Sequence, residues 1–140
     1  MFFSVDPSDG LPIYEQIVRQ VKFAVARGTL RGGQLLPSVR ELSGTLSVNP
    51  NTVARAYRDL QTEGIVESLR GRGMVICKGA AAGCRRQRKA MLAERIETVL
   101  AEAVGSGLSP AEIETLVARQ LKKLASAAAA SVNGSDGQPP

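Results

Sequence analysis

The sequence predicts a mainly α-helical protein that contains one small β-hairpin. Apolar residues recur at helical spacing in three segments between residues 12 and 62, alternate with a period of two in residues 65–77, and return to helical spacing in residues 86–125. A chain of 140 residues that is 44% hydrophobic suits one compact domain with a small appendage. We therefore expect a domain at residues 1–78, a linker at 79–85, a helical segment at 86–125 and a disordered tail at 126–140.

The first two helices have clear boundaries in the sequence. Residues 12–28 carry apolar side chains at helical spacing, and Gly28 is expected to end this helix. After a glycine-rich turn, Ser38 is followed three residues later by Glu41, which is the pattern of a capping box. The second helix is therefore expected at residues 39–46.

The third helix opens with Asn49, Pro50, Asn51 and Thr52. Asparagine is a favoured cap, and proline suits the first helical position because its missing N–H would be unpaired there. The inward residues are expected to be Val53, Ala56, Tyr57 and Leu60, and the outward residues Asn51, Thr52, Arg55 and Arg58. Two helices joined by a short turn, with polar and cationic side chains at the start of the second, form a helix-turn-helix.

The segment after Gly64 changes to the alternating pattern of β-strands. Residues 65–69 and 74–77 are expected to be two short strands, joined by Arg70-Gly71-Arg72-Gly73, in which the glycines permit a positive φ. A hairpin that directly follows a helix-turn-helix predicts a winged helix, with Arg72 and Gly73 at the tip of the wing.

The C-terminal segment is predicted to contain two amphipathic helices. The second begins at another capping box, Ser109 to Glu112, with Pro110 at the first helical position. Two short helices cannot cover both apolar stripes by packing on each other alone, so the remainder is expected to meet a partner surface. The residues expected at this surface are Leu92, Ile96, Val99, Leu100, Leu116, Leu121 and Leu124.

The basic charge of the chain is concentrated in one region. Residues 16–89 hold fourteen Lys and Arg against four acidic residues, whereas residues 90–140 hold four against six. Such a concentration favours a polyanionic partner such as nucleic acid, with an acidic membrane surface or a merely solvated basic face as the alternatives.

The residue types present argue against metal, cofactor and enzyme chemistry. The chain has no histidine and two cysteines, Cys77 and Cys84, so neither a zinc site nor a cysteine–histidine nucleophile can be assembled. No phosphate-binding loop or clustered carboxylate pair is present either. We expect ordinary thiols, with a redox switch as the alternative, and a cytoplasmic protein without a signal peptide or membrane span.

The motifs together resemble a known family. "PIYEQI", "LPSVREL", "VNPNTVARAYRDLQTEGIVE" and "GRGM" are similar to the N-terminal winged helix of GntR-type bacterial transcription regulators, and the Asn-Pro-Asn-Thr-Val run resembles the short YtrA-like subfamily. The resemblance covers roughly residues 3–77. It implies a dimeric, sequence-specific repressor of double-stranded DNA operators, with the C-terminal helices serving dimerisation. Members of this subgroup often regulate neighbouring transporter genes.

Carried over by position, the resemblance implies a set of DNA-contacting residues. They are Ser38, Arg40, Asn49, Asn51, Thr52, Arg55, Arg72 and Gly73. The residue types leave alternatives open: the two asparagines can cap the helix or pair with adenine, and Arg55 can contact DNA or pair with Asp59 one turn on. Arg40 and the basic run at residues 85–89 can be solvated or contact DNA.

The expected function is therefore a DNA-binding transcriptional regulator, with a nonspecific nucleic-acid-binding or protein-interaction winged helix as the alternative. The operator, the regulated genes and any small-molecule effector are not specified by the sequence.

Overall fold

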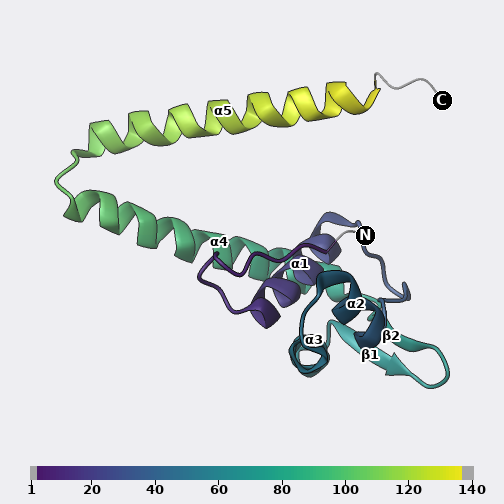
Figure 1. Ribbon diagram of the computed structural model, residues 1–140. Coiled ribbons are helices and arrows are strands. Elements are labelled where there is room, and N and C mark those ends of the chain that lie inside the picture. Colours follow the sequence, from purple (N-terminus) through teal and green to yellow (C-terminus); the bar gives the residue numbers. More distant parts are fainter. Residues whose placement is uncertain (1–2, 137–140) are drawn as a thin grey trace. The chain divides into compact units, whose positions relative to one another are not determined.

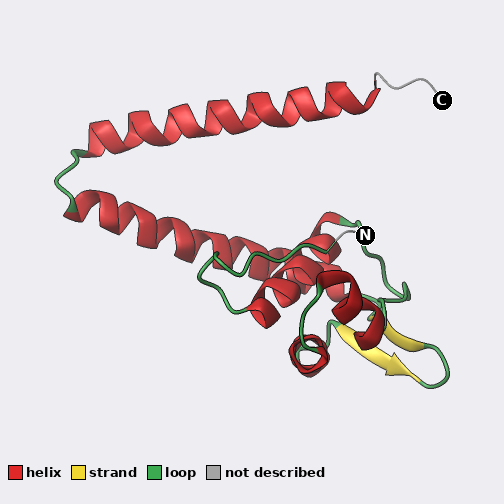
Figure 2. Ribbon diagram, in the orientation of Figure 1, coloured by secondary structure: helices red, strands yellow, loops and turns green. Residues whose placement is uncertain are grey.

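The computed structural model describes residues 3–136 and divides into two compact units, residues 1–92 and residues 93–140. Figure 1 labels the elements, and Figure 2 distinguishes helices from strands. In chain order they are α1 (Ile13–Arg27), α2 (Val39–Leu46), α3 (Pro50–Thr62), β1 (Val66–Leu69), β2 (Gly73–Ile76), α4 (Ala80–Gly105) and α5 (Pro110–Asp136).

Helix α1 forms one wall of the core of the first unit. Its apolar face is buried, with Ile17 and Val21 fully inaccessible to solvent. Gly28 ends the helix with φ +83°, in the left-handed region that glycine adopts without a steric cost. The helix predicted at residues 12–28 is confirmed.

The segment before α1 is held by two glutamine side chains. The Gln16 amide accepts a hydrogen bond from the Asp6 N–H at 2.8 Å and donates one to the Asp6 carbonyl at 2.8 Å. Gln20 makes the same two-way bond to the backbone of Ser4. Gln16 is buried, and the N-terminal segment supplies the hydrogen bonds that its buried amide needs.

Helices α2 and α3 form the predicted helix-turn-helix. Between them Ser47 has φ +54°, an uncommon conformation for a residue with a side chain, and caps the C-terminus of α2. The four residues predicted to face inward from α3 are all buried: Val53, Ala56, Tyr57 and Leu60.

The wing is larger than its sequence predicts. Strands β1 and β2 pair antiparallel from Val66↔Ile76 to Leu69↔Gly73, which confirms the hairpin. A third segment, just before α2, then runs along the other edge of β2, bridging Leu35 to Val75. Hydrogen bonds from the Leu36 N–H to the Met74 carbonyl at 2.8 Å and from the Gly33 N–H to the Ile76 carbonyl at 2.7 Å secure it.

The linker expected at residues 79–85 is wrong, because α4 already begins at Ala80. Cys84 is 1% exposed, and Ala80 and Ala81 pack against the core of the first unit. The physical reason is that alanine is the best helix former, so a single Gly83, worth about 1 kcal/mol, is outweighed by propensity and by burial of Cys84. The first unit extends to Leu92 instead of ending at residue 78.

The disordered tail expected at residues 126–140 is also wrong for most of its length. Helix α5 continues to Asp136, and residues 137–140 lie outside the described part of the chain. The four alanines at 127–130 have the highest helix propensity and lie on a helix that is already nucleated, so it continues through them.

The second unit contains the end of α4 and the whole of α5. The capping box predicted at its turn is present in both directions: the Glu112 N–H donates to the Ser109 Oγ at 3.2 Å, and the Ser109 N–H donates to the Glu112 carboxylate at 2.8 Å. Ile113 is buried and Leu100 is half-buried. The other apolar residues predicted at an interface are exposed. They are Leu92, the last residue of the first unit, and Ile96, Val99, Leu116, Leu121 and Leu124 of the second.

Candidate nucleic-acid interface

The first turn of α3 presents polar groups to solvent. The Asn49 Oδ1 caps the helix by accepting a hydrogen bond from the Asn51 N–H at 2.8 Å, and Pro50 occupies the first helical position. Asn49 and Asn51 are exposed, and Thr52 is half-buried. The turn therefore combines the positive end of the helix dipole with exposed side chains that can accept or donate hydrogen bonds.

The two asparagines differ in which side-chain atoms remain available for hydrogen bonds to DNA. The Oδ1 of Asn49 is occupied by the cap, so a bidentate pair with adenine, which uses both the oxygen and the nitrogen of the amide, would have to compete with it. Among the side chains that the structure describes, the amide of Asn51 makes no hydrogen bond. Asn51 is thus the better placed of the two to read a base edge.

The start of α2 is tied to both the wing and α3. The buried Tyr57 hydroxyl of α3 donates a hydrogen bond to the Pro37 carbonyl at 2.6 Å, one residue before Ser38. Burial, and to a smaller extent the charge of Glu41, raises the pKa of Tyr57, so the hydroxyl remains a donor at neutral pH. Because Leu36 bonds to β2 on the other side, this segment brings the start of α2 between α3 and the wing.

Ser38 and Arg40 lie at this start of α2 and are exposed. The Ser38 Oγ accepts a hydrogen bond from the Glu41 N–H at 3.0 Å, which confirms the predicted cap. The Ser38 hydroxyl hydrogen is not used in that bond and can be donated elsewhere.

Arg55 has a partner that the sequence does not reveal. Its guanidinium carbon lies 3.7 Å from the centroid of the Tyr14 ring, on the first turn of α1. Within the described part of the chain no salt bridge joins Arg55 to Asp59, so the helical ion pair considered from the sequence is not formed. Arg55 remains exposed.

The turn of the wing exposes Arg72 between two glycines with positive φ, Gly71 at +80° and Gly73 at +109°. The Arg72 N–H donates to the Leu69 carbonyl at 3.0 Å, which closes the turn. Residues with side chains rarely adopt these φ values, so the glycines set the shape of the tip from which Arg72 projects.

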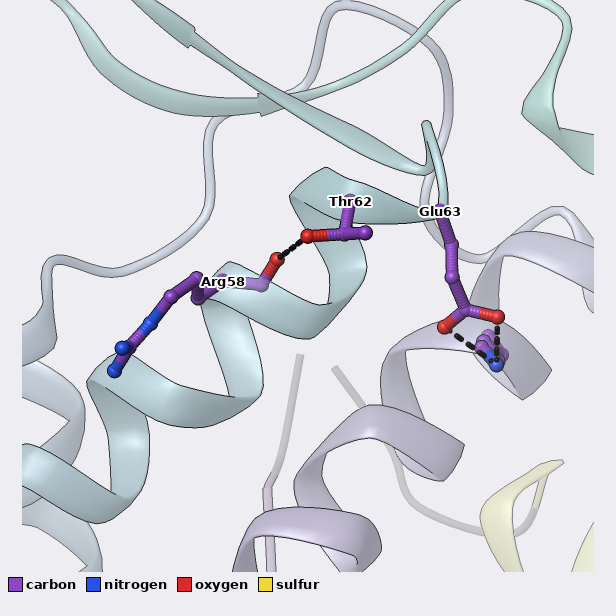
Figure 3. Close-up of polar contacts among 4 residues, drawn as sticks. Arg58, Thr62 and Glu63 are labelled. Atoms are coloured by element: carbon purple, nitrogen blue, oxygen red, sulfur yellow. Dashed lines mark hydrogen bonds and ion pairs between the residues drawn. The ribbon is translucent and has the colours of Figure 1, made fainter.

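An ion pair between a buried lysine and an exposed glutamate joins α1 to the C-terminal end of α3. The Lys22 Nζ lies 2.9 Å from both carboxylate oxygens of Glu63, at the C-terminal end of α3 (Figure 3). The side chain of Lys22 is 10% exposed and that of Glu63 is 37% exposed. In the same view the Thr62 hydroxyl bonds back to the Arg58 carbonyl at 2.9 Å, while the Arg58 side chain points away from Thr62 and Glu63.

The chain matches known proteins over most of its length. Residues 13–76 match the bacterial regulatory proteins of the gntR family. The HTH-type transcriptional repressor YtrA of Bacillus subtilis is 40% identical to this chain over 112 residues, which are 80% of this chain and 84% of that protein. The chain belongs to the GntR family.

Solved structures agree with this assignment. A GntR family transcriptional regulator from Listeria monocytogenes is 32% identical and superposes with a TM-score of 0.65, over 80% of this chain and 97% of that one. YtrA from Sulfolobus acidocaldarius, a GntR-family transcription factor, is 34% identical with a TM-score of 0.54, over 72% and 99%. Our chain is therefore a YtrA-like, DNA-binding transcriptional regulator rather than an enzyme, as predicted.

The cysteines and acidic residues of this GntR-family chain show no sign of metal or nucleophile chemistry in the part that the structure describes. Within the described residues no cluster of histidine, cysteine or acidic side chains could hold a metal ion. Burial is the main cause of the raised pKa of both the Cys77 and the Cys84 thiol, so both are protonated and weakly nucleophilic at neutral pH. Among the residues that the structure describes, no helix is long and apolar enough to span a membrane.

The basic run at residues 85–89 lies on the second and third turns of α4. Arg85, Arg86 and Lys89 are exposed, whereas Arg88 is half-buried. A helical rather than flexible backbone restricts where these side chains can reach.

Proposed function

We propose that this regulator is a homodimeric repressor that binds a palindromic operator. The observation that carries the proposal is the exposed first turn of α3, where Asn51 offers a free amide beside the helix N-terminus. A recognition helix enters the major groove through such a turn, which lies among base edges and phosphates.

The proposed DNA contacts are of two kinds, contacts to base edges and contacts to the sugar–phosphate backbone. Asn51 and Arg55 would read base edges from α3, with Asn49 and Thr52 lining the same end of the helix. Ser38 and Arg40 would hold backbone phosphates from α2, where the helix dipole also attracts anions. Arg72 would reach a phosphate or the minor groove from the wing, and Gly73 would let the backbone approach closely.

The proposed dimer rests on the exposed apolar side chains of the second unit. Ile96, Val99, Leu121 and Leu124 are 57%, 63%, 63% and 65% exposed. Exposed side chains of this size on successive helical turns are unusual in a monomer and typical of an interface. A two-fold interface would hold two identical winged helices at the fixed spacing that a palindromic operator requires.

Repression is proposed because YtrA of Bacillus subtilis is named a repressor and is similar over most of both chains. Control of a transporter operon is proposed by analogy with the YtrA-like subgroup alone.

Footprinting on the DNA upstream of its own gene, followed by competition with unrelated DNA, tests the function. We expect a protected palindrome and a preference of roughly 10³–10⁷-fold over nonspecific DNA. Asn51→Ala should relax the preference at one operator position, while Arg27→Ala, an exposed arginine at the far end of α1, should not. Binding without sequence preference would favour a nonspecific DNA-binding protein instead.

A further inference from the structure

The contact between Tyr14 and Arg55 joins the recognition helix to a fixed aromatic platform. Tyr14 is half-buried on the first turn of α1 and packs against the hydrophobic core. The guanidinium of Arg55 lies over its ring at 3.7 Å from the centroid. This distance is well within the range of about 6 Å over which the ring face attracts a cation.

A guanidinium carbon 3.7 Å from the ring centroid implies that the guanidinium approaches the ring with its face, which leaves the hydrogen-bonding groups of Arg55 available. Guanidinium is planar, so it stacks through its face and donates its five N–H groups from its edge. A ring below the face therefore does not compete with a base or a phosphate for those donors.

The alternative partner of Arg55 would have the opposite effect. A carboxylate at Asp59, one turn further along α3, would approach the edge of the guanidinium and take up N–H donors. That pair is absent within the described part of the chain, and the aromatic stack is present. The side chain is thus restrained without losing its donors.

Restraint matters because a free arginine on a helix surface samples many rotamers. Fixing such a side chain at an interface has an entropic cost that opposes binding. A side chain that is already restrained in the free protein loses less conformational entropy when DNA binds.

We propose that Tyr14 is a positioning residue for DNA recognition: it pre-orients Arg55 so that the guanidinium edge faces the operator. The inference rests on the proposed function, in which Arg55 contacts DNA. Tyr14 itself would touch no base or phosphate and would act through Arg55.

The test is a double-mutant cycle of operator affinity with Tyr14→Leu, Arg55→Ala and the two combined. Leucine keeps an apolar side chain against the core but removes the ring. In the wild-type background, we expect Tyr14→Leu to weaken operator binding about two- to fivefold, which corresponds to the free energy of an exposed cation–π contact. In the Arg55→Ala background, Tyr14→Leu should have no further effect. Tyr14→Phe, which keeps the ring and removes the hydroxyl, should bind like the wild type.

Three results would overturn the inference. Equal losses from Tyr14→Leu in both backgrounds would mean that Tyr14 only supports the fold, and thermal melting of each variant would show the same destabilisation. Unchanged or tighter binding by Tyr14→Leu would mean that the ring does not help Arg55, or holds it away from DNA. A Tyr14→Phe loss as large as that of Tyr14→Leu would assign the effect to the hydroxyl.

The cycle also separates this inference from the proposed function. If Arg55→Ala leaves operator affinity and its sequence preference unchanged, the proposed contact of Arg55 with DNA is wrong, and the positioning role of Tyr14 fails with it. If Arg55→Ala weakens binding by roughly 5- to 150-fold but Tyr14→Leu does not, the contact stands and the positioning role alone is wrong.

Discussion

Removing Glu63 should destabilise the protein much more than removing its partner, Lys22. The Lys22 Nζ lies 2.9 Å from both Glu63 oxygens, and its side chain is 10% exposed, against 37% for the carboxylate. Without Glu63 a nearly buried ammonium has lost its acceptor, whereas without Lys22 the carboxylate can still be hydrated. A fully buried pair loses about 3–5 kcal/mol when one partner is removed, and partial exposure lowers this to about 1.5–3 kcal/mol for Glu63→Ala.

The opposite truncation, Lys22→Met, keeps most of the aliphatic stem and should cost less than about 1 kcal/mol. The double variant should be about as stable as Lys22→Met alone, since Glu63 has no buried charge left to stabilise. Urea unfolding at pH 7, followed by circular dichroism at one fixed protein concentration, measures all four proteins. Glu67→Ala, at an exposed position on β1, is the matched control and should change stability by less than about 0.5 kcal/mol.

The asymmetry is the decisive outcome. If Lys22→Met costs as much as Glu63→Ala, or if Glu63→Ala behaves like the Glu67 control, then the exposures of the two side chains do not govern the energetics of the pair, and the reasoning is refuted.

Three further outcomes are expected. Tyr57→Phe leaves the Pro37 carbonyl without its 2.6 Å donor and should cost about 1–3 kcal/mol in the same urea assay; an unaffected midpoint would contradict this. Arg72→Ala should flatten the slope of log K against log salt for operator binding by roughly 0.9 if it neutralises a phosphate; lost affinity at an unchanged slope would favour shape reading in the minor groove. Leu121→Asp should break the proposed dimer into monomers in sedimentation and weaken operator binding by roughly 10²–10⁴-fold; a variant that still sediments as a dimer would remove Leu121 from the proposed interface.

The features predicted correctly from sequence depend on residues close together in the chain. Ser38 bonds to Glu41 three residues on, and Asn49 bonds to Asn51 two residues on. The strands of the wing are joined by three residues, Arg70-Gly71-Arg72, and Gly73 opens the second strand. Local chemistry and spacing are sufficient to specify such features.

The features missed join segments that are far apart in the chain. Tyr14 and Arg55 lie on different helices, and Lys22 of α1 meets Glu63, the residue that caps the end of α3. Each contact depends on the relative rotation of α1 and α3, which a single sequence does not specify. The start of α4 was missed for a different reason. Alanines and glycines are typical both of linkers and of tightly packed helices, and only the burial of Cys84 in the tertiary fold distinguishes the two.

The amide clamp of Gln20 on Ser4 has a consequence for how the N-terminus tolerates sequence change. Both bonds go to the backbone of Ser4, so the side chain acts as a neighbouring strand would, and any residue except proline, which lacks the N–H donor, can stand at position 4 without losing them. Position 20, in contrast, needs one donor and one acceptor on the same planar group, which glutamate cannot supply at neutral pH. Sequence variation among natural or engineered variants should therefore be wide at position 4 and narrow at position 20, the reverse of what side-chain contacts alone would suggest.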